Sequence, residues 1–494
     1  MKPQRPILDW SNLRNWTNPA HQSIMAERLI IIGGVAAGMS AAAKARRMNP
    51  ALEIVVYEKS GHISYGACGF PYFIKGDVTR LEDLIARTPA QMAAQGVMAH
   101  VCHEVTAIDP AQQAVRVMDH KNGRLFTDHW DKLIITTGAS VNRPPIPGAN
   151  LPGVFTLRTV EDALAIQRWL VEEKPKHGVI VGAGYIGLEM AEALQAHGLA
   201  VTLVEMADQV LPGLDVDMAA LVQVELQAHG VQICLQQPVK SFVGPTLVRE
   251  VVREVAAKVQ GDGGENGRLR IHEVLTPGSI LAADMVVFGV GGRPNVTLAQ
   301  AAGIHLGQTG AIAVDEYQRT NLPNVWAAGA AAESKHLILN KPIYWPLAVP
   351  ANKQGRVAGT NAAGGQAKSG MVAGTAVVKV FDLAVGVTGL TEKQAQAAGL
   401  NAASVTIEAS SRAHYMPGQS PIHLKLVYEQ ETERVLGAQM VGKDGIAKRI
   451  DIIAAALHAN WTIHELAELD LSYAPPFAPV WDPILVAANV AKKS

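Results

Sequence analysis

Cys68 is the residue of this chain best suited to redox chemistry, and it lies in the segment SYGACGFPY at residues 64–72. The chain of 494 residues contains 3 cysteines, and Cys102 and Cys234 are distant from Cys68 in sequence. Thiol–disulfide exchange needs an attacking sulfur and a second sulfur that resolves the mixed disulfide. A reactive Cys68 therefore predicts a partner sulfur from outside the chain. The alternative is an inert buried cysteine, the commoner state for a lone one.

A glycine-rich turn precedes this segment. It follows an apolar, β-branched run at residues 27–32, contains Gly33, Gly34, Val35 and Gly38, and leads into an alanine-rich, helix-compatible run at residues 39–48. Glycines let the backbone approach a pyrophosphate, and the N-terminus of the next helix favours an anion. Glu58 ends the following strand-like run, about 20 residues after the last glycine, where a carboxylate can bind ribose hydroxyls. The combination favours a dinucleotide site over a tight packing turn.

The same arrangement recurs at residues 178–205. A strand-like run at 178–181 leads into a turn and a helix at 188–197, and the next run ends in Glu205; the turn residues are Gly182, Gly184, Tyr185, Ile186 and Gly187. Two dinucleotide units in one chain indicate electrons passing from one cofactor to the other. Glu205 would repel a 2′-phosphate and accept from a 2′-hydroxyl, and no arginine follows within the next eight residues, so NADH is favoured over NADPH.

These units predict an α/β protein with two Rossmann-like domains and a C-terminal α+β domain. Apolar segments at 130–138, 285–294 and 324–329, with a proline-rich stretch at 143–152, indicate that the second unit is inserted into the first. The predicted parts are an N-terminal extension (1–25), a FAD-binding domain (26–152 and 286–373), an NAD-binding domain (153–285) and a C-terminal domain (374–494). Residues 244–280 are polar and predict a hairpin or an exposed insertion.

The composition excludes several classes of protein. A formal net charge of −1 gives no overall basic field, so nucleic acid is not a predicted partner. No run of about 18 apolar residues suits a membrane span. The few cysteines, and the lack of an apolar signal run in residues 1–25, predict a cytoplasmic protein. No metal site is predicted.

The order of these motifs, ending in LSYAPPFAPVWDP at residues 471–483, resembles the single-cysteine branch of the flavin-dependent pyridine nucleotide–disulfide oxidoreductases. Coenzyme A-disulfide reductases and NADH-dependent persulfide reductases are the most similar members. The resemblance implies FAD, NADH (or NADPH) and coenzyme A as cofactors, and a small-molecule sulfur substrate. It also implies a homodimer in which the C-terminal domain of one subunit covers the flavin site of the other. Cys68 would form a mixed disulfide with coenzyme A.

Further roles are implied by the resemblance alone. Besides the two turns, the implied cofactor-binding residues are Lys59, Thr137, Gly138, Arg158, Gly291, Gly329 and Ala330. The implied coenzyme A contacts are Ser40, Lys44, Arg47 and Ser64, although a solvated helix face is the alternative for the two basic residues. Tyr415 and Tyr473 would come from the partner subunit and donate a proton to a leaving thiolate. The alternative for them is a place in the core.

One position departs from the family. Members usually have an aspartate that binds the flavin ribityl chain where this chain has Ala330. Losing one charged hydrogen bond weakens binding by about 1.5–3 kcal/mol, so we expect weaker FAD binding.

In the implied reaction, electrons pass from NADH through FAD to the mixed disulfide, and the freed thiolates reduce the sulfur substrate. A short helix at residues 69–75 predicts a lowered pKa for Cys68. The alternative function is an NADH oxidase that cycles through a cysteine sulfenic acid. Water-forming oxidases carry a histidine in the first turn, whereas this chain has Val35-Ala36-Ala37, which favours sulfur chemistry. A flavoprotein that passes electrons to a protein partner is a third possibility.

Overall fold

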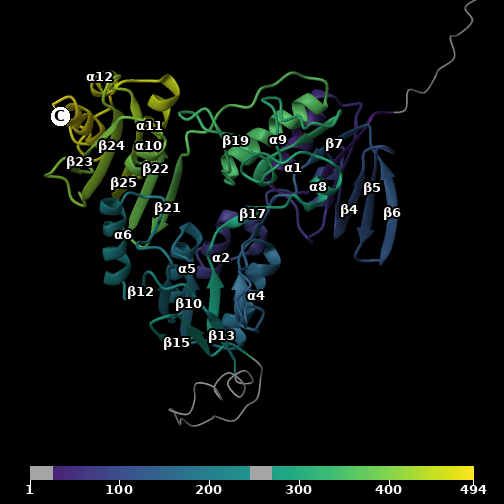
Figure 1. The fold of residues 1–494 in the computed structure, drawn as a ribbon, viewed down its shortest axis with the longest axis horizontal. Helices are drawn as coiled ribbons and strands as arrows, with labels where there is room; N and C mark the ends of the chain where they lie inside the picture. Colours follow the sequence, from purple (N-terminus) through teal and green to yellow (C-terminus); the bar gives the residue numbers. More distant parts are fainter. Residues whose placement is uncertain (1–25, 245–269, 494) are drawn as a thin grey trace, which may run out of the picture.

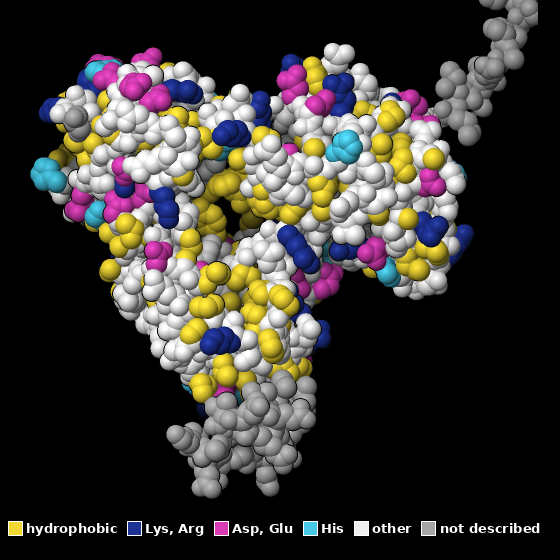
Figure 2. All heavy atoms as spheres, in the orientation of Figure 1, with side chains coloured by type: hydrophobic (Ala, Val, Ile, Leu, Met, Phe, Trp, Pro, Cys, Tyr) yellow, Lys and Arg dark blue, Asp and Glu magenta, His cyan; other side chains and the backbone are white. Residues whose placement is uncertain are grey.

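The computed structural model describes residues 26–244 and 270–493, which form three lobes (Figure 1). The predicted N-terminal extension and residues 245–269 of the predicted insertion lie outside the described residues. One lobe contains the first dinucleotide unit, the second contains its repeat, and the third is formed by the C-terminal part of the chain. Figure 2 shows a hollow where the lobes meet, with hydrophobic side chains gathered around it.

The sheet of the first lobe is parallel and combines two separate parts of the chain. In spatial order its strands are β18 (Val325–Ala327), β7 (Lys132–Ile135), β1 (Arg28–Ile32), β2 (Glu53–Glu58) and β3 (Val97–Val101). Helices α1 (Ala36–Met48) and α9 (Ala348–Ala362) cover one face of this sheet. An antiparallel sheet of β4 (His103–Asp109), β5 (Ala114–Asp119) and β6 (Arg124–His129) packs on the other face.

The second lobe repeats this architecture. Its parallel sheet has the order β12 (Gln232–Cys234), β11 (Ala200–Val204), β10 (His177–Val181), β16 (Met285–Phe288) and β9 (Val154–Thr156). Its helices are α4 (Val160–Glu172), α5 (Tyr185–Ala196) and α6 (Val216–Ala228). An additional antiparallel sheet consists of β13 (Ser241–Val243), β14 (Glu273–Leu275) and β15 (Ile280–Ala282). Strand β14 lies in the described part of the predicted insertion, and β15 begins at the last residue of that range.

The third lobe is an antiparallel sheet covered by helices. Its strand order is β21 (Ala376–Val380), β22 (Leu383–Gly389), β25 (Val435–Gly442), β24 (Pro421–Glu429) and β23 (Ala402–Ser410). Its helices are α10 (Glu392–Ala397), α11 (Ile446–Ala459), α12 (Ile463–Ala467) and α13 (Pro483–Ala491). Buried aliphatic side chains of α11 and α13 share one core with the strands. The predicted fold class, two Rossmann-like domains and an α+β domain, is therefore confirmed.

The chain also contains shorter elements. They are η1 (Ala67–Gly69), α2 (Phe70–Lys75), η2 (Leu81–Leu84), α3 (Pro89–Ala93), β8 (Ala139–Val141), β17 (Gly292–Pro294), α8 (Thr297–Ala301), η4 (Gly329–Ala331), β19 (Ser334–Lys335) and β20 (Pro342–Ile343). Within residues 26–244 and 270–493, no helix has both the length and the apolar character needed to cross a bilayer.

Both helices of the dinucleotide units begin earlier than the sequence indicates. Helix α1 starts at Ala36 rather than at residue 39, and α5 starts at Tyr185 rather than at residue 188. The glycines Gly38 and Gly187, which mark the predicted turns, already belong to the first turn of each helix. Both glycines are buried. A Cβ on Gly38 would overlap the carbonyl oxygen of Gly33, and a Cβ on Gly187 would overlap that of Gly182.

Candidate functional site

A pocket of about 1410 Å³ extends along the carboxyl ends of the strands in the first lobe. It brings together residues that are scattered along the sequence. The predicted site residues that line it are Gly33, Val35, Ser40, Arg47, Glu58, Lys59, Ser64, Cys68, Thr137, Gly138, Arg158 and Ala330. Four other predicted residues do not line the pocket but are adjacent in sequence to residues that do: Gly34, Gly38, Lys44 and Gly329. An elongated cofactor and the thiol can therefore share this space.

The turn between β1 and α1 leaves room for a phosphate group. Gly33 has φ of +101°, and a Cβ there would overlap the Thr136 carbonyl oxygen. The N-cap residue of α1, Val35, makes no side-chain capping hydrogen bond, so the helix N-terminus is open to an anion. These features fit the pyrophosphate of FAD.

Glu58 is fixed at the end of β2. It is buried, and its two carboxylate oxygens accept hydrogen bonds from the backbone N–H groups of Gly34 (2.7 Å) and Ser60 (2.8 Å). The acid is thus held against the first turn, and it lines the pocket beside Lys59.

The second unit reproduces this geometry. Glu205 follows β11, is buried, and accepts from the N–H groups of Ala183 (2.7 Å) and Ala207 (2.8 Å). Gly182 has φ of +103°, and Gly184 is the N-cap of α5 without a side-chain capping bond. Tyr185, Ile186 and Gly187 begin α5, and Gly291 lies with positive φ just before β17. None of these residues is among those that line the pocket of the first lobe, so the structure holds two separate dinucleotide turns.

Cys68 lies in η1, directly before α2. Although it is accessible from the pocket, the surrounding protein atoms withdraw the thiol from bulk water and raise its pKa. The negative charge of Glu189 raises this pKa further, while the Arg158 guanidinium lowers it. The predicted lowering of the Cys68 pKa is therefore wrong. The helix that follows has only six residues, and burial makes the largest contribution to the pKa of Cys68.

Glu189, on α5 of the second unit, was missed by the sequence analysis. Its Oε1 accepts a hydrogen bond from the Tyr72 hydroxyl of α2 at 3.2 Å. Burial raises the pKa of Glu189 to about 7. The sequence does contain a signal for Glu189, because it is a charged residue inside the apolar run of a predicted helix. The contact joins the second unit to the segment that carries Cys68.

Glu189→Gln should make Cys68 more reactive and Arg158→Gln should make it less reactive, because the two charges shift the thiol pKa in opposite directions. Glu189 is negatively charged above about pH 7, so the gain in the first variant should be clear at about pH 8 and small at about pH 6. Rates of Cys68 alkylation by iodoacetamide, followed by mass spectrometry across this range, measure both effects. Identical pH profiles in the two variants would contradict the assignment.

Three of the four predicted coenzyme A residues lie on one face of α1, and Ser64 lies between β2 and η1. Ser40, Lys44 and Arg47 are spaced by four and three residues, which places them side by side along a helix. Ser40 Oγ donates to Asn352 Oδ1 of α9 at 2.6 Å. Ser40, Arg47 and Ser64 line the pocket, whereas Lys44 is not among its lining residues.

Ala330 lies in η4 and is 8% exposed. It lines the pocket, and its carbonyl oxygen accepts from the Tyr344 hydroxyl at 3.2 Å. The nearby acid Glu333 does not replace the missing aspartate, because its carboxylate accepts from the backbone and hydroxyl of Thr309.

Ala330→Asp should slow FAD loss roughly 10- to 100-fold, because one charged hydrogen bond contributes about 1.5–3 kcal/mol. Ala330 lines the pocket, so an added carboxylate would be next to this space. Retention of absorbance near 450 nm during dialysis measures the effect, and Ala330→Asn is the matched control without the charge. Equal retention in the wild type and the aspartate variant would contradict the expectation.

Tyr415 and Tyr473 lie together on the third lobe. Their hydroxyl oxygens are 3.4 Å apart, and the residues are 62% and 46% exposed. Neither is among the residues that line the pocket of the same chain. Exposed apolar side chains follow Tyr473 at Phe477, Val480 and Trp481. Both tyrosines are therefore surface residues rather than core residues.

Two dinucleotide turns, a pocket with one thiol and a separate α+β lobe define a two-cofactor oxidoreductase. The family model "Pyridine nucleotide-disulphide oxidoreductase" matches residues 27–367, and the dimerisation domain of the same family matches residues 375–483. The chain belongs to the pyridine nucleotide-disulphide oxidoreductases, whose members use FAD and NAD(P)H.

Similar proteins extend over nearly the whole chain. The NAD(P)H coenzyme A polysulfide/persulfide reductase of Pyrococcus horikoshii is 39% identical over 95% of this chain and 99% of its own. The NADH oxidase of Methanocaldococcus jannaschii is 36% identical over 94% of this chain and 99% of its own. The solved NAD-dependent persulfide reductase of A. fulgidus has a TM-score of 0.87 at 38% identity, covering 94% of this chain and 83% of that one. The predicted family resemblance is confirmed.

Proposed function

We propose that this chain is an NAD(P)H- and FAD-dependent reductase of coenzyme A disulfide, persulfide or polysulfide, with Cys68 as its single redox-active residue. The observation that carries the proposal is the pocket. Of the three cysteines, all of which lie in the described residues and are free, only Cys68 lines it. The second sulfur must then come from a bound thiol, and coenzyme A is the thiol named for the P. horikoshii relative.

FAD, when bound, supplies the relay that carries the electron pair of NADH to sulfur. Cys68 Sγ holds the mixed disulfide with coenzyme A. Two electrons and one proton cleave that bond to give the Cys68 thiolate and the free coenzyme A thiol. The positive charge of Arg158 favours the thiolate, whereas Glu189 disfavours it when it is ionised. The thiolate then attacks a sulfur of coenzyme A disulfide or of coenzyme A persulfide, which re-forms the mixed disulfide and releases coenzyme A thiolate or hydrosulfide.

The other site residues take roles that fit their positions. We assign FAD to the first turn and to the pocket residues around it: Gly33, Gly34, Val35, Gly38, Glu58, Lys59, Thr137, Gly138, Arg158, Gly329 and Ala330. We assign the nicotinamide dinucleotide to Gly182, Gly184, Tyr185, Ile186, Gly187, Glu205 and Gly291. Ser40, Lys44, Arg47 and Ser64 would bind coenzyme A, since a guanidinium fork on α1 suits its phosphates. Buried Glu205 favours NADH, because no cation in the following turn would balance a 2′-phosphate.

The proposal includes a homodimer. Tyr415 and Tyr473 are exposed in the single chain and lie outside its own pocket, which fits hydroxyls that complete the pocket of a partner subunit. The match of residues 375–483 to the family's dimerisation domain supports this arrangement. We further propose the domain limits 26–152 with 286–373, 153–285 and 374–494. A cytoplasmic location fits three free cysteines.

Cys68→Ser tests the function directly. NADH should still bleach the flavin absorbance near 450 nm, while turnover of coenzyme A disulfide and persulfide should fall by more than about a thousandfold, because the nucleophile is lost. Cys234→Ser is the matched control and should leave turnover unchanged. Full disulfide turnover by Cys68→Ser would reject the proposal. Oxygen consumption by the wild type that exceeds its disulfide and persulfide reduction would favour an NADH oxidase instead.

Trp481→Ser should weaken the dimer. Trp481 is 62% exposed in the single chain, and truncating an aromatic anchor at an interface costs about 2 kcal/mol or more, so the dissociation constant should rise roughly 30-fold. Light scattering across a dilution series measures the change. Val171→Ser, at an exposed apolar position on α4, is the control. A Trp481→Ser dimer as stable as the wild type would place the interface elsewhere.

A further inference from the structure

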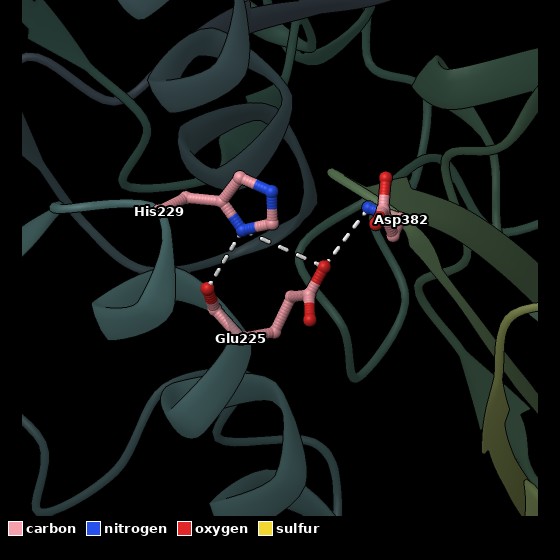
Figure 3. A group of neighbouring side chains, drawn as sticks. All are labelled: Glu225, His229 and Asp382. Atoms are coloured by element: carbon pink, nitrogen blue, oxygen red, sulfur yellow. Dashed lines mark hydrogen bonds and ion pairs between the residues drawn. The ribbon is translucent and has the colours of Figure 1, made fainter.

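A group of three metal-ligating side chains lies between the second and third lobes, away from the thiol pocket (Figure 3). Glu225 is in the last turn of α6, and His229 is the residue that caps this helix. Asp382 is in the tight turn between β21 and β22. One ligand atom from each residue lies within 4.8 Å of the other two. Residues from two lobes thus converge on one small space.

The imidazole of His229 is held with one nitrogen available. Its Nδ1 lies 3.0 Å from the carbonyl oxygen of Glu225. A carbonyl can only accept a hydrogen bond, so Nδ1 carries a hydrogen, and in the neutral form of the ring the lone pair is then on Nε2. Metal-binding histidines commonly use one nitrogen in this way to fix the tautomer and the direction of the ring. Figure 3 shows the Nδ1 contacts to Glu225 as dashed lines, and no dashed line joins the second nitrogen to Glu225 or Asp382.

The turn between β21 and β22 positions both the His229 ring and the Glu225 carboxylate. Phe381 is buried and stacks on the His229 ring, with centroids 4.2 Å apart and an interplanar angle of 13°. The next residue, Asp382, donates its backbone N–H to Glu225 Oε1 at 3.0 Å. The two side chains on α6 are therefore positioned by the same turn that supplies the third carboxylate.

The charge of the group favours a cation. Two carboxylates face one imidazole, and the Nζ of Lys443 lies 3.0 Å from Asp382 Oδ2. Lys379 also acts electrostatically on Asp382, but its Nζ is paired with Glu192 at 2.6 Å. The Lys443 side chain is half exposed, so it can move away without leaving a buried group unpaired. A divalent ion would balance both carboxylates.

We propose that Glu225, His229 and Asp382 form a site for a divalent transition metal of the zinc type. One imidazole nitrogen and two carboxylate oxygens are ligands that zinc accepts in a tetrahedral arrangement, with water in the fourth position. The imidazole favours such metals over magnesium or calcium, which prefer oxygen ligands alone. The bound ion links the predicted NAD-binding domain to the C-terminal domain and takes no part in the electron transfer proposed above.

Titration of the FAD-loaded enzyme with Zn²⁺ tests the site, by calorimetry and by thermal unfolding. His229→Ala and Asp382→Asn should each weaken binding about 10- to 100-fold, since even residues that only orient ligands contribute that much. The increase in melting temperature caused by Zn²⁺ should also be lost in both variants. His458→Ala, an exposed histidine in the last turn of α11, is the matched control and should behave as the wild type.

Asp382 is exposed, so Asp382→Asn keeps the test valid if His229→Ala does not fold. Zn²⁺ affinity that is unchanged in Asp382→Asn would overturn the proposal. The same conclusion would follow if alkylation of Cys68 abolished Zn²⁺ binding, because the ion would then occupy the thiol pocket. These outcomes are independent of whether the chain reduces disulfides.

Discussion

The close approach of three backbone segments in the first lobe determines where its cofactor can lie. Thr136 follows β7, and its N–H donates to the Ile32 carbonyl at 2.8 Å, while its hydroxyl contacts the carbonyls of Ile32 and Gly33. A side chain at Gly33 or Gly38 would occupy this space. In the second lobe, Gly289 occupies the corresponding position. Its N–H donates to the Val181 carbonyl oxygen at 2.7 Å, and it packs against Gly182 and Gly187. With the strand and helix held this closely, only the backbone faces a bound pyrophosphate.

The parts of the site that depend on local sequence could be predicted. Glycine spacing, helix-compatible runs and the acids Glu58 and Glu205 are properties of about thirty consecutive residues, in which strand, turn and helix have fixed lengths. The hydrogen bonds of both acids to their turns follow from the same spacing. The start of each helix was misplaced because the last glycine was counted as part of the turn, whereas it packs inside the helix.

The electrostatics of Cys68 could not be predicted, because they arise from packing between distant segments. The short helix α2 lies against α5, which brings Tyr72 to Glu189 across more than a hundred residues of sequence. A helix N-terminus is visible in a sequence, but the burial that opposes it is not. The group of Glu225, His229 and Asp382 could not be predicted for the same reason. Glu225 and His229 are four residues apart, whereas Asp382 comes from a turn in another lobe.

The position of Glu189 connects the second dinucleotide turn to the thiol. Tyr185 begins α5 at that turn, and Glu189 follows four residues later on the same face of the helix. The pKa of Glu189 is about 7, so its charge responds to small changes in its surroundings. Any ligand at the second turn that changes the proton occupancy of Glu189 must change the pKa of Cys68, because the carboxylate contributes to that pKa. By linkage, ionisation of Cys68 must change the affinity for that ligand by the same factor by which the ligand changes the acid dissociation constant of Cys68. One buried carboxylate thus couples the lobe that carries the dinucleotide turn to the segment that carries the thiol.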